Sequence, residues 1–388
     1  MNQSNPTIAV AAPLTPAGRS AVAVVGIRPV EIQTFEQRLD LLFSPMAAKP
    51  FSMIQRKLVY GRWNSSNEDL VVVRCDDGSI EVHCHGGNLA IESVLDSLRS
   101  QGVQVVTAEQ FQHQALGRWP AETIDALSRT VTQKTARIIA RLMNIQDNVI
   151  ASLRESILNS DDAPEAKSVE ALLAHIRSIL SWSKFGRHLT QPRSIVLFGQ
   201  PNVGKSSLVN QIVGFQRAIV NAKAGTTRDI VTQKTAIGGW PVEFKDTAGL
   251  RNSGDVIESI GIEKAKQEID RADLRIAVLD ASSPLDSTAK NSIAAAAPHL
   301  VVLNKIDLIE DPQSLAQTFS NAIPVSATTG ENMEHYVDAM IKVMVPELPP
   351  ADQWFPVTDW QTEELTALLH GIEQLGFAAG RTIINQWT

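Results

Sequence analysis

The stretch that decides the fold is Gly199-Gln200-Pro201-Asn202-Val203-Gly204-Lys205-Ser206, which directly follows the short apolar run Ser194–Phe198. It fits the pattern G-x-x-x-x-G-K-S/T, the phosphate-binding loop that connects a buried strand to a helix. The glycines let backbone N–H groups turn toward phosphate oxygens, the Lys205 ammonium reaches the β- and γ-phosphates, and the Ser206 hydroxyl ligates Mg²⁺. A glycine turn without a ligand is the alternative, but the strand–loop–helix context favours phosphate binding.

Two motifs after this loop carry side chains suited to Mg²⁺ and the γ-phosphate. Gly225-Thr226-Thr227-Arg228-Asp229 stands in a loop before a predicted strand, where a threonine can close over both groups. Asp246-Thr247-Ala248-Gly249 ends a predicted strand. There the Asp246 carboxylate would hold Mg²⁺ through water, and the Gly249 N–H would sense the γ-phosphate.

Two later motifs are suited to guanine recognition. Asn304-Lys305-Ile306-Asp307 ends a further predicted strand, and the Asp307 carboxylate can accept from guanine N1–H and the 2-amino group, donors that adenine lacks. Ser326-Ala327 follows the last predicted strand, where a backbone N–H could meet guanine O6. The five motifs in this order predict a GTPase that converts GTP to GDP and phosphate. Its predicted catalytic residues include Lys205 and Thr227, and its predicted Mg²⁺ ligands are Ser206, Thr227 and Asp246. Its predicted nucleotide-binding residues are Gly199, Asn202, Val203, Gly204, Lys205, Ser206, Ser207, Thr226, Gly249, Asn304, Lys305, Asp307, Ser326 and Ala327.

Composition bounds the class of protein. A chain of 388 residues, 44% hydrophobic and 20% charged, has material for two or three domains and excludes a mainly disordered or fibrous protein. The net charge of −7 argues against a protein that binds nucleic acid nonspecifically through its phosphates, because such proteins are usually basic. No apolar run approaches the roughly 20 residues of a membrane helix, and no basic segment opens a signal peptide. Two cysteines fit a reducing compartment, so we expect a cytoplasmic protein without membrane contact.

Changes in hydrophobic periodicity divide the chain into four predicted segments. Residues 1–117 mix short β-rich runs with one helix, and residues 118–190 show helical spacing. Residues 191–345 alternate strands and helices, which is typical of a mostly parallel, doubly wound sheet, and residues 346–388 add a closing helix. The predicted fold is an α/β P-loop GTPase domain inserted in an α-helical domain and preceded by a small α+β domain.

The residues after Gly249 raise the question of how GTP is hydrolysed. Many GTPases place a glutamine there to orient the attacking water, whereas this sequence reads Leu250-Arg251-Asn252. Arg251 could act like an arginine finger, but a surface charge on the loop is the favoured interpretation. Some other group must position the water.

The run Asp246–Ala265 resembles switch II of the tRNA-modification GTPases of the TrmE or MnmE type, and Gly199–Asn210 resembles their phosphate-binding loop. The resemblance implies that two G domains dimerise around K⁺, which takes the place of an arginine finger. It also implies that Asn202 ligates K⁺ and that Glu258 is the catalytic residue that orients the water. Helix N-terminal stabilisation is the alternative role for Glu258.

The resemblance extends to the N-terminal part of the chain. Thr15–Val22 is similar to the amino-terminal signature of the family, and Glu81–Gly87 is similar to its strand ending in His-Gly-Gly. The resemblance implies a homodimer, a 5-formyl-tetrahydrofolate site that includes Arg19, and helices that cooperate with a GidA-type flavoprotein on the wobble uridine of tRNA.

The end of the sequence departs from the family. Where the family ends in Cys-Ile-Gly-Lys, this sequence ends Asn385-Gln386-Trp387-Thr388. That difference predicts a shortened, divergent member that hydrolyses GTP but modifies tRNA poorly or not at all. The alternative function is a GTP-dependent switch or a ribosome-associated GTPase of the Era or Der kind, although such proteins usually carry a basic RNA-binding appendage.

His83, Cys84 and His85 need a local interpretation as well. The two histidines share one face of a predicted strand, and Cys84 or Cys75 could complete a metal site. A strand that runs into the turn at Gly86-Gly87 is the favoured interpretation.

Overall fold

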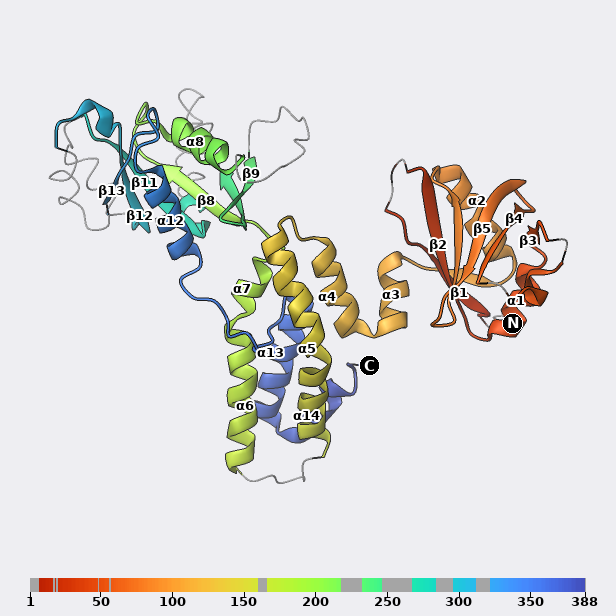
Figure 1. Cartoon of the computed structure of the whole chain (residues 1–388). Helices are drawn as coiled ribbons and strands as arrows, with labels where there is room; N and C mark the ends of the chain where they lie inside the picture. The colour runs from red at the N-terminus through yellow and green to blue at the C-terminus, as the bar shows by residue number, and fades with distance from the viewer. Residues whose placement is uncertain are drawn as a thin grey trace, which may run out of the picture. The chain divides into compact units, whose positions relative to one another are not determined.

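The computed structural model describes residues 7–16, 18, 20–47, 49–55, 57–159, 166–217, 232–245, 267–283, 296–311 and 322–387. The chain divides into two compact units, residues 1–122 with 387–388 and residues 123–386. Figure 1 shows the first unit in red to orange and the second in yellow to blue. None of the helices in the described part of the chain combines the length and the apolar character that a membrane span requires.

The first unit is built on a seven-stranded sheet with the strand order β3-β4-β5-β6-β2-β1-β7. Only the pair β1 and β7 is parallel, and the other neighbours are antiparallel. The strands are β1 Ala9–Pro13, β2 Val22–Pro29, β3 Phe43–Pro45, β4 Leu58–Trp63, β5 Glu68–Arg74, β6 Ile80–His85 and β7 Val103–Val105.

One face of this sheet carries the core of the first unit. Side chains alternate along β4, so that Val59 and Trp63 are buried while Leu58 and Tyr60 are exposed. The buried face packs against α1 (Ile32–Leu39) and α2 (Asn88–Ser100) through one apolar cluster. The helices α3 (Ala108–Leu116) and α4 (Arg118–Ser128) follow, separated by Gly117 with a φ of 78°.

The second unit contains a six-stranded sheet with the order β13-β12-β11-β8-β10-β9. All neighbours are parallel except β9 and β10, which form an antiparallel hairpin at one edge. Residues buried on both faces, as along β12, make each central strand an almost continuous apolar run. The strands are β8 Arg193–Phe198, β9 Thr232–Ile237, β10 Trp240–Lys245, β11 Leu274–Asp280, β12 Leu300–Asn304 and β13 Ala322–Pro324.

Among the described residues of the second unit, two helices pack with this sheet. The helix α8 (Lys205–Arg217) follows β8, and α12 (Met333–Met344) contributes Tyr336 and Met340 to the core of the sheet. The order of strands and helices confirms the predicted α/β P-loop architecture with a mostly parallel sheet.

The helical part of the second unit is made from two segments of the chain, one that precedes the strands of the sheet in the sequence and one that follows them. α5 (Gln133–Leu158), α6 (Ala166–Ser181) and α7 (Ser183–Arg187) precede β8, while α13 (Asp359–Leu375) and α14 (Phe377–Ile384) follow α12. α13 packs on α6 and α14 packs on α5, as Figure 1 shows. The predicted insertion of the α/β domain into a helical domain is therefore confirmed. The exact boundaries at residues 117, 190 and 345 stay a prediction.

The tip of the β9–β10 hairpin contacts the start of α5. The Thr132 hydroxyl donates to the Gly239 carbonyl at 2.8 Å, and the Lys134 ammonium donates to the Gly238 carbonyl at 3.1 Å. That ammonium also lies 4.5 Å from the centre of the Trp240 ring. Lys134 therefore helps to hold the β9–β10 hairpin against the start of α5.

A buried polar network joins the helices. Gln361 Nε2 donates to Thr123 Oγ1 at 2.8 Å, and Gln361 Oε1 accepts from the Val357 N–H at 2.9 Å. The Thr123 hydroxyl in turn donates to the Gln146 side-chain carbonyl. Thr123, Gln146 and Gln361 are all at most 1% exposed, so water cannot replace a lost partner.

We expect Gln361→Ala to lower the free energy of unfolding by about 2–4 kcal/mol, because it leaves a buried N–H without an acceptor and opens a cavity. Urea unfolding followed by circular dichroism measures this change. Glu363→Ala, at an exposed position of the same helix, is the control and should change stability by less than about 0.5 kcal/mol. Equal effects of the two substitutions would show that the network contributes nothing.

Candidate nucleotide-binding site

The phosphate-binding loop lies between β8 and the first turn of α8, as the sequence predicts. Its backbone takes left-handed or otherwise strained values, with φ of 149° at Gly199, 62° at Asn202 and 92° at Gly204. A Cβ on Gly199 would lie 2.2 Å from the Val278 carbonyl oxygen, and a Cβ on Gly204 would lie 2.2 Å from Asn304 Nδ2. Both glycines are needed because the neighbouring strands approach the loop closely.

The charged and hydroxyl groups of this loop gather at the start of α8. The Lys205 ammonium donates to the carbonyls of Gly199 and Gln200 at 3.2 and 2.8 Å, so it lies over the loop. Ser206 and Ser207 are exposed in the first turn, and Asn202 is exposed in the loop. A lysine ammonium, hydroxyls and a helix N-terminus together form an arrangement that can bind phosphates and a hydrated cation.

The buried side chain of Asn304 connects three loops. Its Nδ2 donates to the Val203 carbonyl at 2.9 Å, and its Oδ1 accepts from the Ala327 N–H at 3.0 Å. Asn304 is only 2% exposed. The phosphate-binding loop, the end of β12 and the segment after β13 are therefore held together by one amide.

The predicted base-recognition residues lie next to this amide. Asp307 is exposed in the short 3₁₀ helix Ile306–Leu308, which directly follows β12. The Ser326 N–H donates to the Glu331 carbonyl at 3.1 Å, and the Ser326 hydroxyl accepts from the Thr329 N–H at 3.0 Å. The N–H groups of Ser326 and Ala327 thus already have protein acceptors, and their contact with guanine O6 stays a prediction.

Sequence reasoning missed one group of this site. The Lys305 ammonium lies 2.5 Å from the Asp280 carboxylate at the end of β11. The signal that could have found Asp280 is its place at the carboxyl end of a parallel strand, where ligands bind in open α/β sheets.

Several predicted residues fall outside the described part of the chain. These are Thr226, Thr227, Asp246, Gly249 and Glu258 around the γ-phosphate, and Arg19 in the N-terminal unit. Their roles stay predictions.

The histidines near the end of β6 do not converge on a metal. His83 Nε2 lies 2.8 Å from Glu81 Oε2, and His85 Nδ1 lies 2.7 Å from Glu68 Oε1. Cys84 points to the buried face, and burial raises the pKa of its thiol to about 11. Each histidine therefore has its own carboxylate, and the arrangement supports the interpretation as a strand that runs into a turn.

Among the described residues, a different trio brings possible metal ligands together. Glu109, His113 and Glu122 each offer one ligand atom, and these atoms lie within 4.8 Å of one another. Arg118 Nε lies 3.6 Å from Glu122 Oε1, so a guanidinium already offsets part of the charge.

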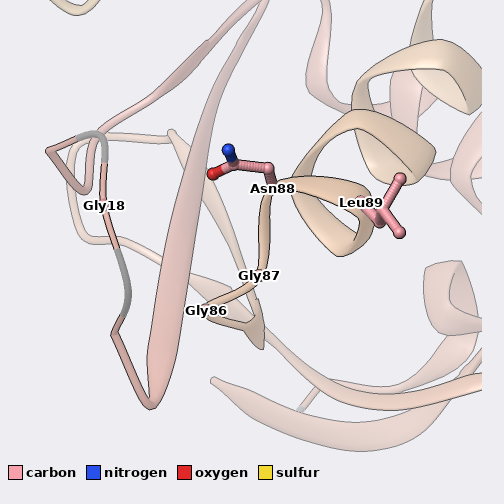
Figure 2. A pocket seen from close by; sticks show the side chains of 5 residues that line it. All are labelled: Gly18, Gly86, Gly87, Asn88 and Leu89. Carbon is pink, nitrogen blue, oxygen red and sulfur yellow. The ribbon is translucent and has the colours of Figure 1, made fainter.

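A pocket of about 380 Å³ lies at the N-terminus of α2 in the first unit, lined by Gly18, Gly86, Gly87, Asn88 and Leu89. Figure 2 shows the Asn88 amide directed toward the Gly18 segment and Leu89 directed away from it. Of the five described residues in this lining, only Asn88 has a polar side chain, and none is charged. Arg19, the residue that the resemblance implies for a folate site, lies outside the described residues next to Gly18, so the folate site stays a prediction.

The fold and the loop define the class of this protein, a P-loop GTPase. A family model described as "50S ribosome-binding GTPase" matches residues 194–305. The tRNA modification GTPase MnmE of Syntrophotalea carbinolica is 30% identical over 76% of this chain and 71% of its own length. The MnmE of Carboxydothermus hydrogenoformans is 29% identical over 87% of this chain and 82% of its own length. The chain belongs to the MnmE family of tRNA modification GTPases.

One solved structure that is similar to part of this chain is Era in complex with MgGDPNP and nucleotides 1506–1542 of 16S ribosomal RNA. The two chains are 29% identical, and the match covers 46% of this chain and 64% of the Era chain, with a TM-score of 0.33.

Proposed function

We propose that this protein is a cytoplasmic, homodimeric GTPase whose hydrolysis is stimulated by K⁺ and by contact between two G domains. The observation that carries its nucleotide-binding part is the Asn304 amide, which bonds to both the phosphate-binding loop and the segment after β13. Dimerisation and K⁺ stimulation rest on the resemblance to the family. In this proposal Ser206, Thr227 and Asp246 hold Mg²⁺, Lys205 and Thr227 act on the γ-phosphate, and Asp307 recognises guanine.

K⁺ would bind beside the phosphates through Asn202. This side chain is exposed in the loop, and its backbone is left-handed with a φ of 62°. A cation at that place offsets negative charge that develops as the phosphoryl group is transferred. An amide oxygen is a suitable ligand because it is a hard, neutral donor.

We expect GTP turnover by the wild-type protein to be roughly tenfold faster or more in K⁺ than in Na⁺, since each 1.4 kcal/mol of transition-state stabilisation gives a factor of ten. Asn202→Ala should abolish this difference while GDP affinity stays nearly unchanged. Phosphate release in the two salts, with the oligomeric state followed in parallel, measures both quantities. Equal rates of the wild-type protein in K⁺ and Na⁺ would contradict the proposed cation site.

Glu258 would orient the attacking water, because no glutamine follows Gly249. We expect Glu258→Ala to lower kcat by about 100-fold, the usual contribution of a group that acts only in the transition state, with little change in nucleotide affinity. Single-turnover hydrolysis measures kcat, and GDP titration measures affinity. Unchanged kcat would assign Glu258 to helix stabilisation instead.

Modification of the wobble uridine of tRNA, together with a GidA-type flavoprotein, is the proposed output of the switch. The family membership supports it. A 5-formyl-tetrahydrofolate site that includes Arg19 remains part of the proposal, and no step of GTP hydrolysis depends on it.

A GTP-dependent switch without tRNA modification is the second candidate. The observation in its favour concerns the two cysteines of the sequence. Cys84 is buried with a raised pKa, and Cys75 is partly buried directly after β5 in the first unit. A thiol with such a pKa is a poor nucleophile.

Complementation separates the two candidates. A bacterial strain that lacks its own MnmE is given this chain, and modified wobble uridine is quantified by mass spectrometry of its tRNA. Restored modification supports the family's role, whereas K⁺-stimulated turnover without modification supports the switch.

A further inference from the structure

The ends of β11 and β12 place a carboxylate and a lysine side by side. The two strands are parallel, and their register pairs Asp280 with Asn304. The Ala281 N–H donates to the Asn304 carbonyl at 2.8 Å, which continues the pairing past the end of β11. Lys305 therefore lies one residue beyond the position opposite Asp280, directly after the end of β12.

The conformation of Lys305 brings its side chain back to β11. Its φ of 69° and ψ of 36° are left-handed values, which a lysine adopts only at some cost in free energy. The ammonium then lies 2.5 Å from Asp280 Oδ2. The side chain of Lys305 is 30% exposed and that of Asp280 is 14% exposed, so water screens this ion pair less than a surface pair.

Asp280 is itself held in place. Its Oδ1 accepts from the Ser282 N–H at 2.9 Å and from the Ser282 hydroxyl at 2.6 Å, which leaves Oδ2 for the lysine. Burial raises the pKa of Asp280, but the hydrogen bonds from Lys305 and Ser282 outweigh it and hold the pKa below its ordinary value. Asp280 thus stays a carboxylate at neutral pH and keeps its charge toward Lys305.

The ion pair borders the amide that connects the nucleotide loops. Lys305 lies between Asn304, whose side chain reaches Val203 and Ala327, and the 3₁₀ turn that carries Asp307. Because the ammonium is anchored at Asp280, the four-carbon stem of Lys305 cannot swing freely into solvent. An anchored stem stiffens the turn on which base recognition depends.

We propose that Asp280 is a positioning residue for nucleotide binding, which acts through Lys305 to set how long GDP and GTP stay bound. This inference rests on the proposed nucleotide site and adds to it a residue that does not touch guanine. Asp307 would decide which base is accepted, and the Asp280–Lys305 pair would decide how slowly the accepted nucleotide leaves.

The test measures the dissociation of fluorescent N-methylanthraniloyl-GDP from the full chain during a chase with excess GDP. We expect Asp280→Asn and Lys305→Met each to speed dissociation by about tenfold, the effect of losing one partly buried charged hydrogen bond. The double variant should be no faster than Lys305→Met alone, because Asp280 acts only through the lysine. Asp280→Glu, which keeps the charge, should restore part of the slow dissociation.

Two further measurements separate positioning from a general loss of structure. The preference for GDP over xanthosine diphosphate should not change in Asp280→Asn, since Asp307 remains. Ser282→Ala, a milder change that removes one donor to Asp280, should speed dissociation by about threefold. Glu373→Gln is the matched control, because it breaks the 2.7 Å ion pair with Arg177 between α6 and α13 and should leave dissociation unchanged.

Unchanged dissociation in Asp280→Asn, or a double variant whose acceleration equals the product of the single ones, would overturn the inference. A wild-type protein that retains no labelled GDP would overturn the proposed nucleotide site as well. The two failures are therefore distinguishable in the same experiment.

Discussion

Replacing Asp307 by asparagine is expected to move the preference of this protein from guanine to xanthine nucleotides by about 100-fold. The aspartate carboxylate accepts two hydrogen bonds from guanine, one from N1–H and one from the 2-amino group. An asparagine offers one acceptor and one donor, which suits the 2-oxo group of xanthine. The substitution creates one unmatched contact at the 2-amino group of guanine and removes one at the 2-oxo group of xanthine. Each unmatched polar contact costs roughly 1–3 kcal/mol, so the two changes together give the expected factor.

Competition titrations with GDP, xanthosine diphosphate and ADP measure this preference. The 3₁₀ turn that carries Asp307 is held by the Ile306 N–H, which donates to the Val325 carbonyl at 3.3 Å, so the substitution should leave the turn in place. Asp338→Asn, at an exposed position of α12, is the control and should keep the guanine preference. Equal affinity of the wild-type protein for GDP and ADP would remove Asp307 from base recognition.

Gly204→Ala is expected to weaken GDP binding by about 100-fold and to lower the midpoint of thermal unfolding. The new Cβ would lie 2.2 Å from Asn304 Nδ2, and the φ of 92° already disfavours any residue with a Cβ. Asn304 is buried, so it can move only by giving up its bonds to Val203 and Ala327. Backbone strain of about 1–2 kcal/mol and a buried amide without partners at about 1–3 kcal/mol add to the expected loss.

The same helix offers a matched control for this substitution. Gly214 lies within α8, and a Cβ there would meet nothing within 4 Å. Gly214→Ala should therefore bind GDP normally and raise the free energy of unfolding by about 0.5–1 kcal/mol, because alanine is the better helix former. If both glycine substitutions bind GDP alike, the close approach of Asn304 to the loop has no bearing on the nucleotide.

The predictable part of the fold is the part that depends on neighbours in sequence. The spacing of apolar residues predicts helices over residues 118–190, and α5 runs there over Gln133–Leu158. The glycines and lysine after a buried strand predict the phosphate-binding loop before α8. Helical spacing and turn chemistry act over a few residues, so they are legible without knowledge of the fold.

The core of the candidate site was predictable only as a set of separate motifs. Each motif follows a strand, and parallel strands bring their carboxyl ends to one edge of the sheet. The sequence therefore indicates that Gly204, Asn304 and Ala327 lie near one another, but not which atoms meet.

The sequence by itself determined the class of this protein, because the order of five short motifs and the alternation of strands and helices are local properties. Only the tertiary structure decided the contacts that join those motifs. Asn304 reaches Val203 across 101 positions of sequence, and Lys305 reaches Asp280 across 25. Such pairs depend on the strand order and register of the sheet, which follow from packing of the whole domain rather than from any short pattern.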